Sequence, residues 1–441
     1  MLTAALAPLR HRPFRHLAVG RAATMLGNAV APIALGFAVL DLTGSVRDLG
    51  LVVGARSLTN VLFLLFGGVL ADRLPRQAVM VASLSAAALT QGAVAALVLT
   101  DTATISLLVV LGAVNGVLSG LAWPAAAALV PQTVPAELLQ SANAVNRLGI
   151  NAAMIGGASL GGLLVAGAGP GWGLLVDALT FALAAVAFSR IRVAAVARPA
   201  TNRPHPLRDL REGWGEFVAR SWVWVVVLGF LLINFAYASS VNVLGPRIAD
   251  ETIGRFAWGL VLAAQTAGMV AGAALALRIR VRRFLLLGVL CMGVDAVLLV
   301  TLAWTSSVWL LIGTAFVAGV AVEQFSIAWE TSMQRHIPAD RLARVYSYDA
   351  LGSFLAIPLG QIAIGPVAEV LGYQRTLLLA AGIVLVAVLG MLADPGVRRL
   401  DSSSSAAVSD EQPERPSTAV PDGPPDPATS VLSSVDTAPA R

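Results

Sequence analysis

The sequence predicts an all-α membrane protein, with twelve transmembrane helices in two pseudo-symmetric six-helix halves and both termini in the cytoplasm. Three observations predict it. The 441 residues are 57% hydrophobic and 12% charged, with a mean hydropathy of +0.78, which exceeds what the core of a water-soluble protein would hold. Long apolar stretches recur along the whole chain, and a segment of the first half returns in the second.

The apolar stretches have the length of membrane spans. A helix needs about twenty residues to cross the hydrocarbon core. Frequent small residues, including 41 glycines, suit the close helix packing found in lipid. The windows expected to cross cover residues 16–40, 48–70, 78–98, 104–130, 139–166, 171–189, 222–246, 256–277, 284–304, 308–333, 344–368 and 373–393.

The basic residues set the orientation. All thirty are arginine, and most fall in loops on one side, whereas the loops on the other side carry only Arg47, Arg247, Arg255 and Arg375. The positive-inside rule therefore places both termini in the cytoplasm. The net charge of +5 follows from this topology. Because the arginines form no patch with interleaved aromatic residues, no nucleic-acid partner is expected.

Four segments divide the chain. Residues 1–189 form the first six-helix half and residues 222–394 the second. Residues 190–221 are a basic cytoplasmic linker whose end, LRDLREGWGEFVARS, predicts a short interfacial helix. Residues 395–441 are rich in Ser, Pro and Asp without apolar periodicity, which predicts a disordered cytoplasmic tail.

The two halves share an internal repeat. VPAELLQSANAVNRLG at 134–149 aligns with IPADRLARVYSYDALG at 337–352 at a constant offset of 203 residues. Pro135 falls on Pro338, and Gly149 falls on Gly352. Each copy precedes the fifth helix of its half. Duplicated halves with a site between them near the midplane are typical of transporters that work by a rocking motion.

A charged turn follows the second span. Gly68-x-x-x-Asp72-Arg73-x-x-Arg76 resembles the loop signature of the major facilitator superfamily. TGS at 43–45, VPAELLQSANAV and GASLGG at 157–162 resemble its drug-exporter branch, which includes macrolide-efflux-like and siderophore-exporter-like proteins. The resemblance covers about residues 1–395 and implies the major facilitator fold and transport by alternating access.

The sequence departs from that pattern in three places. Ala158 stands where the family usually has proline, and Asn28 stands where relatives often carry aspartate. The second copy of the charged loop, LALRIRVRR, has no acid that matches Asp72. An asymmetric gate is therefore expected.

Five charged residues are predicted to act in gating. A carboxylate at Asp72 can approach the N-terminus of a helix from the other half and gain about 0.3–1 kcal/mol from its dipole. Arg73 and Arg76 complete this latch, or they serve only as positive-inside anchors. Arg147 and Asp349 lie near the cytoplasmic ends of helices 5 and 11, so a pair across the half-interface and a local pairing are both open.

Acids inside the spans are costly and are therefore candidate functional residues. In the family that the chain resembles, helix 10 lines the cavity, so Glu323 and Glu330 are predicted to carry the coupling proton. Glu323 could instead form a fixed pair with an arginine such as Arg147, or oppose a cationic cargo directly. Asp177 and Asp295 are expected to make packing hydrogen bonds, and Arg56 has no evident partner.

Uncharged polar and aromatic residues in the spans are the remaining candidates. Those predicted to bind substrate are Asn28, Asn115, Asn234, Tyr237 and Trp329. Interhelical hydrogen bonds and aromatic packing are the alternative explanation for each of them.

The motifs of enzymes are missing from the sequence. It contains no GxxxxGK[ST] phosphate loop and no HExxH. The four histidines are scattered and Cys291 is the single cysteine, so neither a metal site nor a cofactor is expected.

The sequence thus predicts a proton-coupled exporter of a small, mostly apolar molecule, such as a drug, an antibiotic or a siderophore-like compound. The expected protein is a monomer with several spans in the bacterial cytoplasmic membrane, and its partners are the substrate, protons and the lipid bilayer. The alternatives are an importer or facilitator of a metabolite and, from another class, a non-transporting membrane scaffold or sensor.

Overall fold

The computed structural model describes residues 7–73, 76–127, 130, 133–191, 214–215, 217–276, 278, 281–337 and 339–400. Within these ranges, the structure describes the backbone but not the side chains of residues 64–73, 76, 122–127, 136, 140, 339–340, 343–344 and 347. Everything described here belongs to one compact unit, Met1–Ser405.

The part of the chain that the structure describes is built from helices, with no strand among its elements. The first half contains η1 (Ala7–Arg10), α2 (Arg12–Thr43), α3 (Val46–Arg73), α4 (Arg76–Leu99), α5 (Ile105–Ala127), η3 (Ala136–Leu138), α6 (Leu139–Gly167) and α7 (Pro170–Ser189). The second contains α9 (Ser221–Ile233), η4 (Asn234–Ala238), η5 (Ser240–Leu244), α10 (Gly245–Glu251), α11 (Arg255–Ala276), α12 (Phe284–Cys291), α13 (Val294–Trp304), α14 (Val308–His336), α15 (Ala339–Phe354), α16 (Ala356–Leu371), α17 (Tyr373–Ala393) and α18 (Pro395–Arg399).

Every expected span overlaps one helix or several consecutive helices. Within the described residues, ten helices are long and apolar enough to cross a membrane, and Ile105–Leu121 is a shorter apolar helix. The all-helical prediction is therefore confirmed. The count of twelve crossings stays a prediction.

Three of the expected spans are not regular α-helices. The seventh passes through the π-helical segments η4 and η5 before α10. Pro246 contributes to this change, because it has no N–H to donate to the carbonyl of Asn242. The ninth span is interrupted between α12 and α13, and the eleventh between α15 and α16. Pro358, in the first turn of α16, cannot donate to the carbonyl of Phe354, which explains the second interruption.

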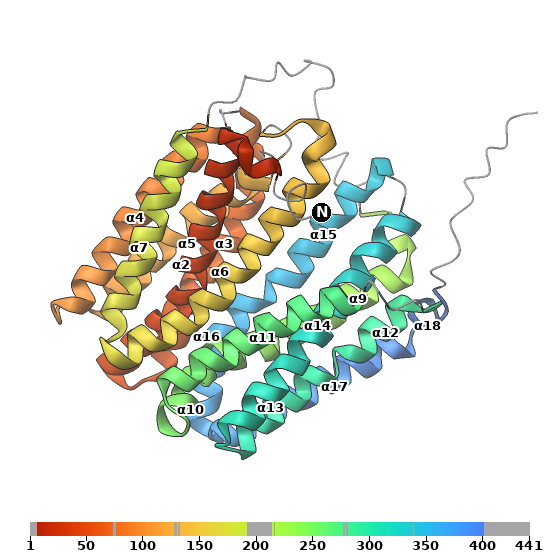
Figure 1. Cartoon of the computed structure of the whole chain (residues 1–441). Coiled ribbons are helices and arrows are strands. Elements are labelled where there is room, and N and C mark those ends of the chain that lie inside the picture. Colours follow the sequence, from red (N-terminus) through yellow and green to blue (C-terminus); the bar gives the residue numbers. More distant parts are fainter. Residues whose placement is uncertain are drawn as a thin grey trace, which may run out of the picture. The chain divides into compact units, whose positions relative to one another are not determined.

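The two halves meet at the end of the helices remote from the start of α2 (Figure 1). There α6 packs against α11, and α3 against α16. Gly162 and Gly259 allow the first contact, since a Cβ at Gly162 would lie 2.9 Å from the Cα of Gly259. Gly365 allows the second, because its Cβ would lie 2.7 Å from the Cα of Arg47.

The buried apolar side chains form two clusters that follow the same division. One joins residues at the remote end of the first half, such as Phe37, Leu49 and Val165, to the interior of the second half. The other contains Phe14 and Phe188 at the opposite end of the first half and includes no residue of the second half among those described. The described core is therefore continuous between the halves at one end only.

The predicted boundary of the C-terminal tail at residue 395 is wrong by several residues. Pro395–Arg399 form α18, and the side chain of Val397 is fully buried. Asp394 caps this helix by accepting a hydrogen bond from the backbone N–H of Gly396 at 2.7 Å. The tail from residue 401 onward lies outside the described residues.

The end of the linker packs on the second half. Trp214 and Phe217 both contact the ring of Tyr348 on α15, with ring centroids 5.5 and 5.7 Å away. The first part of the predicted interfacial helix, residues 207–213, lies outside the described residues.

Candidate functional site

Helix α14 carries the central acid of the candidate site. Glu323 lies in the middle of α14 and is buried. Gly272 on α11 leaves room for it, since a Cβ at Gly272 would lie 3.0 Å from the Cβ of Glu323. The neighbouring Gln324 fixes the rotation of α14, because its Nε2 donates to the carbonyl of Gly272 at 2.6 Å.

Glu323 forms an ion pair with an arginine of the other half. Arg147 Nη2, on α6, donates to Glu323 Oε1 at 3.3 Å. The carboxylate side chain is 7% exposed, whereas the arginine side chain is 72% exposed. The pair is therefore open to solvent on one side. Like other partly exposed ion pairs, it contributes about 1 kcal/mol of free energy to the contact between the halves.

The pair proposed between Arg147 and Asp349 is not formed. Asp349 Oδ2 instead accepts a hydrogen bond from Trp329 Nε1 at 3.1 Å, and its Oδ1 accepts one from the hydroxyl of Ser353 at 3.2 Å. Both partners belong to the second half. Of the two possibilities left open for Asp349, the local pairing is the one observed.

The substrate candidates mostly contact protein. Asn234 Nδ2 donates to the carbonyl of Ser353 at 2.8 Å, and the hydroxyl of Tyr237 accepts from Gln265 Nε2 at 2.7 Å. Asn115 is buried, with no partner for its amide among the described residues. Asn28 is half-buried.

Trp329 belongs to an aromatic stack. Phe325 stacks on Trp329 with an angle of 8° between the rings, and Phe230 of α9 stacks on Phe325 at 12°. Since Phe325 and Trp329 are both buried, this stack holds α9 and α14 together.

Glu330 lies two turns beyond Glu323 on α14 and is exposed. Its Oε1 accepts a hydrogen bond from Gln334 Nε2 at 3.2 Å. Ser326, between the two acids, is also exposed. A polar stripe therefore extends from Glu323 toward the end of α14.

Three of the four carboxylate oxygens of the two other buried acids, Asp177 and Asp295, lack the expected hydrogen bond among the described residues. Neither carboxylate oxygen of Asp177 has a hydrogen-bond partner among the described residues, and neither does Oδ1 of Asp295. Arg56, for which the sequence suggested no partner, lies near enough to Asp177 for an electrostatic interaction, without an ion pair between their side chains. Asp295 lies close enough to Tyr237 for an electrostatic interaction.

The side chains of the charged turn lie outside the described residues. The backbone places Asp72 and Arg73 at the end of α3 and Arg76 at the start of α4. Their predicted role stays a prediction.

One charged cluster was missed. Arg255 of α11 donates to Asp41 of α2 and to Asp250 of α10. In the sequence these residues resemble ordinary charges at the ends of spans. One feature of the sequence could have revealed the cluster. All three residues lie at the ends of expected spans, on the side of the membrane where the loops carry few charges.

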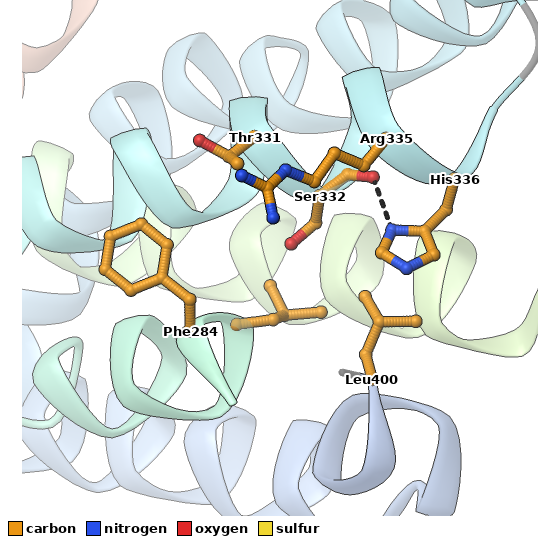
Figure 2. A pocket seen from close by; sticks show the side chains of 7 residues that line it. Phe284, Thr331, Ser332, Arg335, His336 and Leu400 are labelled. Carbon is orange, nitrogen blue, oxygen red and sulfur yellow. Dashed lines mark hydrogen bonds between the residues drawn. The ribbon is translucent and has the colours of Figure 1, made fainter. Parts of the chain in front are cut away.

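A small, shallow hollow lies at the C-terminal end of α14, away from Glu323. Figure 2 shows His336 in this hollow, with its Nδ1 3.0 Å from the carbonyl oxygen of Ser332 and with Leu400 beside it. Across the described residues, no three His, Cys, Asp or Glu side chains are arranged to hold a metal ion.

Comparison with known proteins identifies the family. The family model of the Major Facilitator Superfamily matches residues 17–360. The enterobactin exporter EntS of Shigella dysenteriae serotype 1 (strain Sd197) is 28% identical over 243 residues, which are 55% of this chain and 57% of that protein. The chain thus spans little more than half the length of this curated relative.

Solved structures share the fold. The nucleoside transporter NupG superposes with a TM-score of 0.66 at 16% identity, over 86% of this chain and 98% of that one. A bacterial homolog of the human lysosomal transporter Spinster, in an inward-facing and unoccupied conformation, gives 0.68 at 13% identity, over 88% and 98%. At these identities the likeness concerns the fold alone. Since the family model covers most of the chain, this multi-pass membrane protein belongs to the Major Facilitator Superfamily.

Proposed function

We propose that the protein is a proton-coupled exporter of a small, mostly apolar molecule of the siderophore class. The observation that carries this proposal is the ion pair between Arg147 and Glu323, which joins the two halves in the middle of α14. The likeness to an enterobactin exporter supports the choice of cargo.

The pair couples proton binding to the movement of the halves. A proton that reaches Glu323 removes the negative charge, so the attraction to Arg147 is lost and the halves can separate there. When Glu323 releases the proton, the carboxylate regains the guanidinium. Such a contact, made in one conformation and broken in the other, biases a two-state equilibrium. Glu330, exposed on the same helix, is the next acid on the route to the α14 end.

The proposed topology has twelve crossings and cytoplasmic termini. Residues 1–189 and 222–394 form the rocking halves, and the protein works as a monomer in the bacterial cytoplasmic membrane. The halves meet at the end remote from the start of α2, which makes this conformation inward-facing in the proposed topology. Asp72, with Arg73 and Arg76, forms the cytoplasmic latch that closes in the opposite conformation.

The substrate passes between the halves. Asn28 on α2 has a half-buried side chain and is the first candidate for substrate contact. Asn234, Tyr237 and Trp329 support the cavity wall of the second half through the hydrogen bonds described above. Asn115, which is buried on α5 of the first half, is the remaining candidate.

Everted vesicles test the proposal with enterobactin as the probe. An acid vesicle interior should drive enterobactin inward when the protein is present, because export from the cell is import into an everted vesicle. Glu323→Gln should abolish this uphill movement, since an amide cannot release a proton, while exchange of labelled for unlabelled enterobactin continues. Transport in both proteins is measured with and without the pH gradient.

Glu369→Gln is the matched control, because it removes an exposed carboxylate from α16 and should leave uphill transport unchanged. Uphill accumulation by the Glu323→Gln protein, with the pH dependence of the parent, would contradict the role of Glu323. Efflux of enterobactin from preloaded vesicles under the same gradient would favour the importer. No movement of enterobactin under any condition would refute this cargo.

A further inference from the structure

Arg255, the first residue of α11, connects the two halves at the end where they meet. Its Nη1 and Nη2 donate to the two carboxylate oxygens of Asp41 at 2.8 and 2.5 Å. Its Nε and Nη2 donate to Asp250 of its own half at 2.7 and 3.2 Å. The guanidinium carbon also lies 4.8 Å from the ring centroid of Phe37, one turn before Asp41 on α2. Planar, two-point recognition of a carboxylate is the arrangement that arginine favours.

Local helix stability does not explain these three charges. Asp41 lies in the last turn of α2 and Asp250 in the last turn of α10, where the helix dipole disfavours an anion. Arg255 begins α11, where the dipole disfavours a cation. Each residue is therefore at the unfavourable end of its own helix. Their placement is accounted for by the contact that they make with one another.

We propose that Arg255 is the gating residue of the outer end, and that Asp41 is the partner it releases when this end opens. Asp41 belongs to the first half and must separate from Arg255 in an outward-facing state. Asp250 belongs to the same half as Arg255 and keeps the guanidinium paired after the separation. The opening then breaks one carboxylate contact without leaving an unpaired arginine. This inference rests on the proposed alternating-access function.

A buried reporter residue can follow the opening directly. Val243 on η5 is fully buried, and its Cγ1 would lie 3.7 Å from a Cβ at Gly50 of the opposite half. In a Cys291→Ala background, Val243→Cys is the only thiol, since the chain has one cysteine. Its rate of reaction with a membrane-permeant maleimide measures how often the outer end opens.

Asp41→Asn and Arg255→Gln should each raise the labelling rate about fivefold, as expected for loss of a partly exposed ion pair. The double variant should label no faster than the faster single variant, because both remove the same contact. Asp250→Asn should not exceed the parent rate, because its contact persists in both conformations. Arg247→Gln is the matched control, since it breaks the neighbouring pair with Glu251 inside α10 and should label at the parent rate.

Labelling of Asp41→Asn and Arg255→Gln at the parent rate would overturn the proposal. So would an equal increase in Arg247→Gln, or additive increases in the double variant. The assay needs neither cargo nor a pH gradient. The labelling result can therefore be interpreted even if enterobactin is not exported. The transport assay can likewise be interpreted if the labelling rates contradict the gate.

Discussion

A nearly buried carboxylate and a largely exposed guanidinium share one contact at the centre of the candidate site. The side chain of Glu323 is almost completely buried, whereas most of the Arg147 side chain is exposed. Loss of Arg147 would therefore leave a buried charge on Glu323 uncompensated, whereas loss of Glu323 would leave Arg147 in contact with water. This asymmetry makes Arg147 the partner that can leave, and Glu323 the residue whose charge decides whether it does.

Replacing Arg147 tests that dependence. We expect Arg147→Gln to fold, since the side chain is 72% exposed, and to change the rate at which labelled enterobactin exchanges for unlabelled about fivefold, as loss of about 1 kcal/mol implies. In a Glu323→Gln background, which keeps this exchange although it loses uphill transport, the same change should have no further effect, because the contact is already gone. Exchange rates of the four proteins in everted vesicles, normalised to the amount inserted, measure this. Equal effects of Arg147→Gln in both backgrounds would show that the pair is not the relevant contact.

The sequence pointed to single residues of the candidate site but not to the pairs that they form in the structure. Glu323 was identifiable because an acid in an apolar span is costly and therefore needs a reason. The pair with Arg147 was only one of three roles left open for Glu323, because the register between α6 and α14 depends on how the halves tilt. Arg255 was missed for a similar reason: an arginine at the start of a span resembles an anchor until its partners on α2 and α10 are placed.

At the scale of the helices, the contact between α11 and α14 depends on two reciprocal glycines. A Cβ at Gly319 of α14 would overlap the backbone carbonyl of Gln265, and a Cβ at Gly268 of α11 would overlap that of Phe316. The helices therefore approach backbone to backbone, which is the mode of packing that small residues allow in lipid. This contact holds the helix that carries Glu323.

A matched pair of substitutions on α14 tests this packing. We expect Gly319→Ala to destabilise the protein by about 1–3 kcal/mol, because the methyl group forces two backbones apart. Gly313→Ala, on the same helix with open space around its Cβ, should be neutral or slightly stabilising, since alanine is the better helix former. Apparent melting temperatures in detergent provide the measurement. A drop of equal size in both variants would contradict the close contact.

Hydropathy predicted where the helices lie but not their irregularities. Every window overlaps helix, because apolar length is a property of the segment itself. The π-helical segments of the seventh span have both local and distant contributions. The hydroxyl of Ser240 donates to the carbonyl of Ala236, four residues earlier, at 2.7 Å, and such side-chain bonds compete with regular helix geometry. The bond from Asn234 to a carbonyl of α15 can be recognised only once that partner helix is in place.

At the scale of the whole molecule, the structure constrains which ends of the helices lie on the same side. Asp41, Asp250 and Arg255 are in direct contact, so the ends of α2 and α10 and the start of α11 share one face. The N-terminus of α2 lies at the other end of that helix. The positive-inside rule assigns this other end to the cytoplasm, because most arginine-rich loops belong to it.

Reporter fusions test that assignment across the whole chain. We expect fusions after residues 76, 205 and 400 to report the cytoplasm, since each follows an arginine-rich segment, and fusions after 45 and 251 to report the outside. The two outside positions are the most informative, because they flank the contact between Asp41 and Arg255 from opposite halves. A cytoplasmic signal at 251 with an outside signal at 45 would place two contacting residues on opposite sides of the membrane, which no single fold permits. Cytoplasmic signals at both would invert the gate, so that Arg255 would close the inner end and Asp72 the outer one.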